Sequence, residues 1–158
     1  MDKQKLFQAI QHKPLMADYS ISGHYEYLGT QGDLTGRLST NEQGLLSGEI
    51  IDHGSRSPNQ TMEGKVEVGD GRATLAFFKC PPDTGLANLL YVLQRDGEGE
   101  DLSGLYQGTW AALPRQIVVG AIAETESSSA AALFIVEQQP DYVGGEYAEL
   151  RLEKILDA

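Results

Sequence analysis

The chain has 158 residues and a net charge of −11, from 23 acidic and 12 basic residues. This charge would repel nucleic-acid phosphates and anionic membrane surfaces, so we expect no nucleic-acid partner and no membrane partner. No apolar run approaches the roughly 20 residues of a membrane span, no signal peptide is evident, and the single cysteine, Cys80, excludes an internal disulfide. We therefore predict one cytoplasmic domain over residues 1–158.

The first predicted element is a short N-terminal helix within residues 1–17. Leu6, Phe7 and Ile10 recur at helical spacing, and Pro14 ends the segment. We expect this helix to cover part of the domain as a lid or plug.

After residue 17 the hydrophobic period changes to two, and turn sequences such as TNEQG, VGDG and CPPDTG separate short segments. Strands are expected near 19–28, 33–40, 45–52, 60–68, 72–80, 88–95, 102–111, 115–124 and 131–138. Residues 146–157 fit a strand or a helix, and the preceding Gly-Gly pair favours a tenth strand. The linkers are too short for helical crossovers, which predicts an all-β antiparallel meander.

A glycine recurs at the centre of six short segments, ISGHY, LTGRL, LSGEI, MEGKV, LSGLY and VVGAI. Residues two apart on a strand share a face, so each glycine shares the inward face with its apolar neighbours. Inward glycines allow strands to coil around a barrel axis, and closure removes exposed edges. We predict an antiparallel up-and-down β-barrel of eight to ten strands, with a two-sheet sandwich as the alternative.

The runs GDLTGRL, GLLSGEI and LSGLYQGTW resemble the Gly-x-Tyr and Trp-bearing strands of the calycin group, which includes the lipocalin, avidin and fatty-acid-binding barrels. The resemblance covers most of residues 20–125. It implies a calycin-like barrel with an interior ligand site and assigns no residue of this chain as a ligand contact. Trp110 is the single tryptophan, whereas avidin-like proteins use several, so biotin is not the expected ligand.

Aromatic side chains on the glycine-bearing face form the predicted ligand site. Its residues are Tyr25, Tyr27, Tyr106 and Trp110, with Gly36 and Gly104 leaving space beside them. A barrel of about eight strands is either filled by side chains or holds one small ligand. We predict a β-barrel that binds a small, largely apolar molecule in its interior. The alternatives are a filled barrel acting as an oligomeric protein-interaction module, and a calycin-like isomerase or hydratase.

Motifs for metal binding and for common catalytic mechanisms are missing from the sequence. His12, His24 and His53 lack the spacing of metal ligands, and the acidic stretch DGEGED lacks EF-hand spacing. No nucleophile motif of the Gly-x-Ser-x-Gly kind occurs. We predict no metal, no cofactor and no catalytic residue, and leave enzymatic activity undecided.

Four later segments, ATLAFF, NLLYVL, QIVVGAIA and AALFIV, are apolar on both faces of a strand. Something must cover their outer side, and a twofold interface is a common solution. We therefore predict a homodimer. The alternative is that the N-terminal helix and the C-terminal segment provide the cover.

Overall fold

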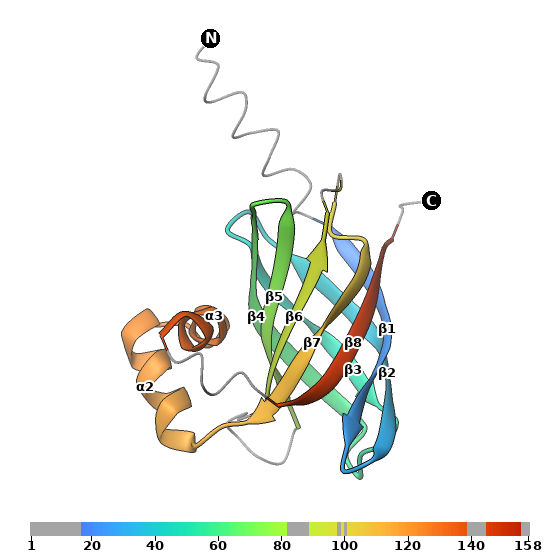
Figure 1. Ribbon diagram of the computed structural model, residues 1–158. Helices are drawn as coiled ribbons and strands as arrows, with labels where there is room; N and C mark the ends of the chain where they lie inside the picture. The colour runs from blue at the N-terminus through green and yellow to red at the C-terminus, as the bar shows by residue number, and fades with distance from the viewer. Residues whose placement is uncertain (1–16, 82–88, 98, 100, 139–144, 156–158) are drawn as a thin grey trace.

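The computed structural model describes residues 17–81, 89–97, 99, 101–138 and 145–155. Eight antiparallel strands form one closed barrel, in which each strand pairs with its neighbours in the chain (Figure 1). The strands are β1 (Asp18–Tyr27), β2 (Thr30–Thr40), β3 (Leu45–Asp52), β4 (Asn59–Gly69), β5 (Arg72–Cys80), β6 (Leu89–Asp96), β7 (Gly104–Ala112) and β8 (Glu146–Lys154). The eighth strand pairs with both β7 and β1 and so closes the barrel. The predicted all-β up-and-down barrel is confirmed.

The barrel interior is an apolar core built by strand alternation. In β3, Leu46 and Ile50 are buried inside the barrel, while Ser47 and Glu49 between them lie on its outer surface. The same pattern places one buried set from every strand in a continuous core. The alternation in the sequence therefore sets which face of each strand points inward.

Five inward glycines let neighbouring strands approach closely. A Cβ at these positions would overlap the backbone of the adjacent strand rather than enter open space; they are Gly23, Gly36, Gly48, Gly64 and Gly108. The closing role predicted for the repeat agrees with this geometry. The space predicted beside Gly36 is occupied, because a Cβ there would overlap the Glu49 carbonyl oxygen of β3.

Two segments predicted as strands, 115–124 and 131–138, are helices. They form α2 (Arg115–Thr125) and α3 (Ser128–Gln138), inserted between β7 and β8. Glu126 ends α2 in the left-handed conformation with φ of 56°, and the Ser127 side chain accepts a hydrogen bond from Ala130 N–H at the start of α3. The glycine in VVGAI, Gly120, therefore lies on a helix and not in the barrel wall.

The helices cover the outer face of the barrel beside β4, β5 and β6 (Figure 1). Ala76 and Phe78 of β5 and Leu90 of β6 pack there against buried residues of both helices, including Val118 and Ile135. This explains why these strands are apolar on both faces. The homodimer predicted from those apolar faces stays a prediction, since α2 and α3 supply a cover within the same chain.

The chain termini bear on two further predictions. Residues 146–154 form a strand, as favoured for the C-terminal segment, and it is the eighth strand rather than the tenth. The predicted N-terminal helix lies outside the described residues, apart from Ala17. Within the described ranges no single helix is long and apolar enough to cross a membrane, and α2 with α3 passes that test only as a pair bent by 111°.

Candidate functional site

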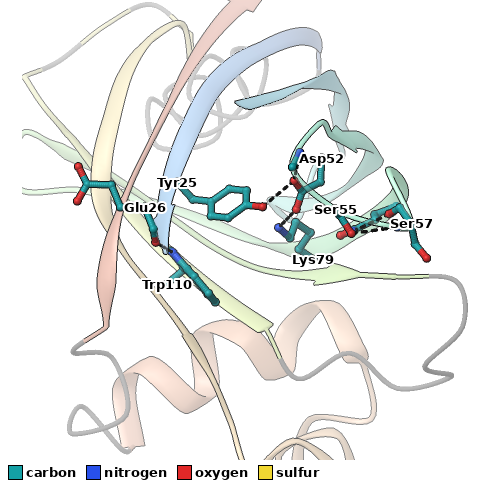
Figure 2. A network of polar contacts seen from close by, with 9 residues as sticks. Tyr25, Glu26, Asp52, Ser55, Ser57, Lys79 and Trp110 are labelled. Carbon is teal, nitrogen blue, oxygen red and sulfur yellow. Dashed lines mark hydrogen bonds and ion pairs between the residues drawn. The ribbon is translucent and has the colours of Figure 1, made fainter. Parts of the chain in front are cut away.

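One end of the barrel interior carries a group of polar and aromatic side chains, which we call the Asp52 cluster: Tyr25, Asp52, Lys79, Tyr91 and Trp110. They come from five different strands. The cluster lies at the end where β3, β5 and β7 finish, and we call this the Asp52 end (Figures 1 and 2). The remaining core toward the other end is predominantly apolar.

A buried ion pair stands at the centre of the Asp52 cluster. Lys79 Nζ lies 2.6 Å from Asp52 Oδ2, and the two side chains are 4% and 3% exposed. Burial lowers the pKa of Lys79, because removal from water disfavours the charged amine, while Asp52 partly opposes this change. Two charges taken out of water need further polar partners to be stable there.

The surrounding groups supply those partners. Asp52 Oδ1 accepts hydrogen bonds from the Tyr25 hydroxyl at 2.8 Å and from Gly54 N–H at 3.0 Å (Figure 2). Lys79 Nζ lies 4.3 Å from the Tyr25 ring centroid and 5.2 Å from that of Tyr91. The carboxylate is thus satisfied on both oxygens, and the ammonium has aromatic rings on its other sides.

Local structure positions Tyr25 over this pair. Tyr25 is paired across strands with Gly32, where any Cβ would overlap the tyrosine ring. Gly54 also lies close to the hydroxyl, in the turn that follows Asp52. Burial, together with the hydrogen bond to Asp52, raises the pKa of Tyr25, so this hydroxyl stays a donor over the ordinary pH range.

Aromatic rings form a layer around Trp110. The Trp110 ring is nearly parallel to the Tyr91 ring, with their centroids 6.0 Å apart. The Tyr25 ring meets Trp110 edge-on, with a centroid distance of 5.7 Å. Tyr91 also stacks on Phe77 at 5.1 Å, and Tyr27 lies 5.8 Å from Trp110. The indole N–H donates to the Glu26 carbonyl at 2.9 Å, which fixes the ring (Figure 2).

Two buried polar atoms at the Asp52 end lack a hydrogen-bond partner among the described residues: the Tyr91 hydroxyl and Gln60 Oε1. The Gln60 amide nitrogen donates to the Ser57 carbonyl at 2.9 Å, which fixes the orientation of that amide. Unpaired buried polar groups are uncommon in folded proteins, so each invites an explanation. Both lie on the inner faces of strands that begin at this end.

The six residues predicted as a ligand site fall into separate places. Tyr25 and Trp110 are half-buried and in contact, and Tyr27 joins them at the rim with 51% exposure. Tyr106 is at the opposite end, where its hydroxyl donates to the Leu102 carbonyl at 2.7 Å. Gly104 is also there, beside Arg95 with φ of 136°, while Gly36 packs against the β3 backbone. These six residues do not form a single site.

Sequence reasoning missed Asp52, Lys79 and Tyr91. The alternation itself carried the signal: Lys79 follows Leu75 and Phe77 on the inward register, and Asp52 follows Ile50. Extending each apolar face by one more inward position would have placed both charges inside the barrel. Tyr91 has the same inward register as Leu93.

Among the described residues no group of three histidine, cysteine or carboxylate side chains could hold a metal ion. Comparisons with protein-family models, curated proteins and solved structures found no match. The closed eight-stranded barrel is consistent with a calycin-like fold in general, and membership of a particular calycin family stays a prediction.

Buried tyrosines make the stability of this barrel sensitive to alkaline pH. Burial raises the pKa of both Tyr91 and Tyr106 well above the ordinary value of 10.0. The folded state therefore holds these protons more tightly than the unfolded state, and the stability they contribute below pH 10 is lost as pH rises. Each linked proton lowers the unfolding free energy by about 1.4 kcal/mol per pH unit above pH 10, so Tyr91 and Tyr106 alone contribute about 3 kcal/mol per pH unit.

Urea unfolding at several pH values, with tyrosinate absorbance recorded in parallel, measures this slope. Tyr106→Phe should reduce the slope by about 1.4 kcal/mol per pH unit, because it removes one linked proton. An unfolding free energy that stays constant above pH 10 would contradict the prediction.

Proposed function

We propose that the protein binds a small, largely apolar molecule at the Asp52 end of the barrel, against Tyr25, Tyr27 and Trp110. The observation that carries this proposal is the partly exposed aromatic layer around Trp110, in which three rings meet at the rim of the barrel. Tyrosine and tryptophan supply large, rigid contact surfaces and are enriched where proteins bind other molecules. Tyr106, Gly36 and Gly104 lie elsewhere and are not part of the proposed contact surface.

A second feature supports ligand binding over a purely structural role. The ion pair of Lys79 and Asp52 sits directly behind the aromatic layer, although apolar side chains of similar volume would often stabilise a core equally well. Ligand sites are mostly apolar with a few placed polar groups that orient the bound molecule. The Asp52 cluster has this composition.

Trp110 provides the test, since it is the single tryptophan of the chain. We expect indane, a flat bicyclic hydrocarbon, to change the Trp110 emission in a saturable way. Its nine non-hydrogen atoms at roughly 0.5 kcal/mol each predict a Kd of about 0.5 mM. Native mass spectrometry of the freshly purified protein would additionally reveal a molecule retained from the cell.

Variants at the two ends separate this site from general surface binding. Tyr27→Ser should weaken indane binding about threefold to tenfold, because it removes a ring from the aromatic layer. Val68→Ser changes an apolar side chain that is 56% exposed at the opposite end of the barrel and should leave the affinity unchanged. Equal effects of both variants, or no saturable change with the unmodified protein, would refute the proposed site.

A further inference from the structure

We propose that the molecule bound at the Asp52 end carries a neutral carbonyl oxygen, which accepts hydrogen bonds from the Tyr91 hydroxyl and the Lys79 ammonium. This inference rests on the proposed function and specifies the polar part of the ligand. It follows from counting which donors and acceptors of the Asp52 cluster are already used.

Both oxygens of the Asp52 carboxylate already accept hydrogen bonds. Asp52 Oδ1 receives two hydrogen bonds, from Tyr25 and Gly54, and Oδ2 receives one from Lys79. A ligand group that only donates hydrogen bonds would have to compete with partners already held at 2.6 to 3.0 Å. The carboxylate is therefore a counter-charge to Lys79 rather than the group that meets the ligand.

The donors of the cluster are not exhausted. A lysine ammonium has three donors, and within the described chain Asp52 is its one hydrogen-bond acceptor. The Tyr91 hydroxyl has no hydrogen-bond partner among the described residues, although Tyr91 is 0% exposed. In the described part of the chain the Tyr91 hydroxyl thus lacks an acceptor, and the remaining donors of Lys79 meet only aromatic rings, so an acceptor oxygen from a bound molecule would satisfy both side chains.

The two side chains that carry these donors are neighbours. Lys79 Nζ lies 5.2 Å from the centre of the Tyr91 ring. Burial is the main cause that raises the pKa of Tyr91, and the charge of Asp52 contributes. Tyr91 also stacks on Trp110 with ring centroids 6.0 Å apart, so a molecule bound against the aromatic layer lies next to the side chains that carry both donors.

The charge balance of the site favours a neutral ligand over an anion. Asp52 already neutralises Lys79, and Lys79 is the one buried basic side chain in the described part of the chain. A carboxylate ligand would add an uncompensated negative charge in a buried place, which is unfavourable. Ketones and amides offer an acceptor oxygen without that charge.

The test compares three ligands that share one bicyclic frame: indane, indanone and indanecarboxylate, titrated by calorimetry. We expect indanone to bind about tenfold more tightly than indane, which is the effect of one well-made hydrogen bond with a contribution from a charged donor. Indanecarboxylate should bind more weakly than indanone. Tyr91→Phe should remove most of the advantage of indanone and leave the affinity for indane unchanged.

Tyr106→Phe is the matched control, because it deletes the same hydroxyl from a buried tyrosine at the opposite end of the barrel. This variant should retain the preference for indanone. If indane does not bind, the proposed function fails. If indane binds but the preference for indanone is absent, or persists undiminished in Tyr91→Phe, the carbonyl inference is overturned while the proposed function stands.

A second measurement needs no variant. The infrared carbonyl stretch of indanone should move to lower frequency on binding to the unmodified protein, as expected for a carbonyl that accepts hydrogen bonds from a hydroxyl and an ammonium. A stretch at the position found in an apolar solvent would overturn the inference, whatever the folding of Tyr91→Phe.

Discussion

Replacing Lys79 with methionine is expected to lower the free energy of unfolding by about 3–5 kcal/mol, as found when one partner of a buried ion pair is removed. Methionine fills a similar volume but leaves the Asp52 carboxylate, which is 3% exposed, without its counter-charge. Tyr25 and Gly54 still donate to Asp52 Oδ1, but they do not neutralise its charge. Urea unfolding at neutral pH measures the loss.

The double variant Lys79→Met with Asp52→Asn isolates the charge effect. Asparagine keeps an oxygen for the Tyr25 and Gly54 hydrogen bonds while removing the buried charge, so the double variant should regain most of the lost stability. Lys154→Met, at an exposed position of β8, should change stability by less than about 0.5 kcal/mol. A double variant as unstable as Lys79→Met would mean that the loss is not caused by the uncompensated charge.

Replacing Gly108 with alanine is expected to destabilise the barrel by about 3 kcal/mol or more, the range of severe overpacking. A Cβ at this position would overlap the carbonyl oxygen of Val92 and lie 3.0 Å from Leu93 Cα, both in the backbone of β6. Neither atom can move without disturbing the β6–β7 pairing. Thermal unfolding and the yield of soluble protein report the effect.

Gly120→Ala is the matched control for that substitution. Gly120 lies on α2 with nothing within 4 Å of a Cβ built there, so alanine should stabilise the protein by about 0.5–1 kcal/mol through its higher helix propensity. Gly36→Ala should resemble Gly108→Ala, because its Cβ would overlap the Glu49 carbonyl of β3. If alanine destabilises the protein at Gly108 and stabilises it at Gly120, the loss at Gly108 comes from backbone crowding and not from a general preference for glycine.

The barrel could be predicted because strand alternation is a local signal. Seven of the predicted segments, from 19–28 to 102–111, match β1 to β7 within a few residues at each end. Each has a polar outer face for part of its length and is bounded by glycine-containing turns. The same alternation placed the repeated glycines of the strands on the inward face of the barrel.

The two helices could not be recognised in this way, because their segments lack a polar face with a clear period. Apart from Gln116, QIVVGAIA and AALFIV are apolar, and such short runs fit a buried strand and a buried helix equally well. Pro114 before α2 and the serines at the start of α3 are the local features that favour helix starts. The choice between helix and strand then depends on how these segments pack against the outer face of the barrel.

The site was only partly predictable for a different reason. Tyr25 and Trp110 were placed inward by alternation, but their contact depends on how β1 and β7 lie across the barrel. The pairing of Asp52 with Lys79 joins positions 27 residues apart on strands that are not adjacent. The sequence shows each charge at a strand end, and the register of β4 between them brings the two together.

The position of β8 has a consequence for synthesis. Gly23 in the first strand pairs with Leu150 in the last, and β7 uses the opposite edge of the same strand. While a ribosome makes the chain from its N-terminus, β1 and β7 each present an unpaired edge until β8 emerges. Such edges favour association with other chains, and contacts between distant residues form slowly. We therefore expect the nascent protein to remain open to misassembly until the helical insertion, which delays the final strand, and β8 itself have been translated.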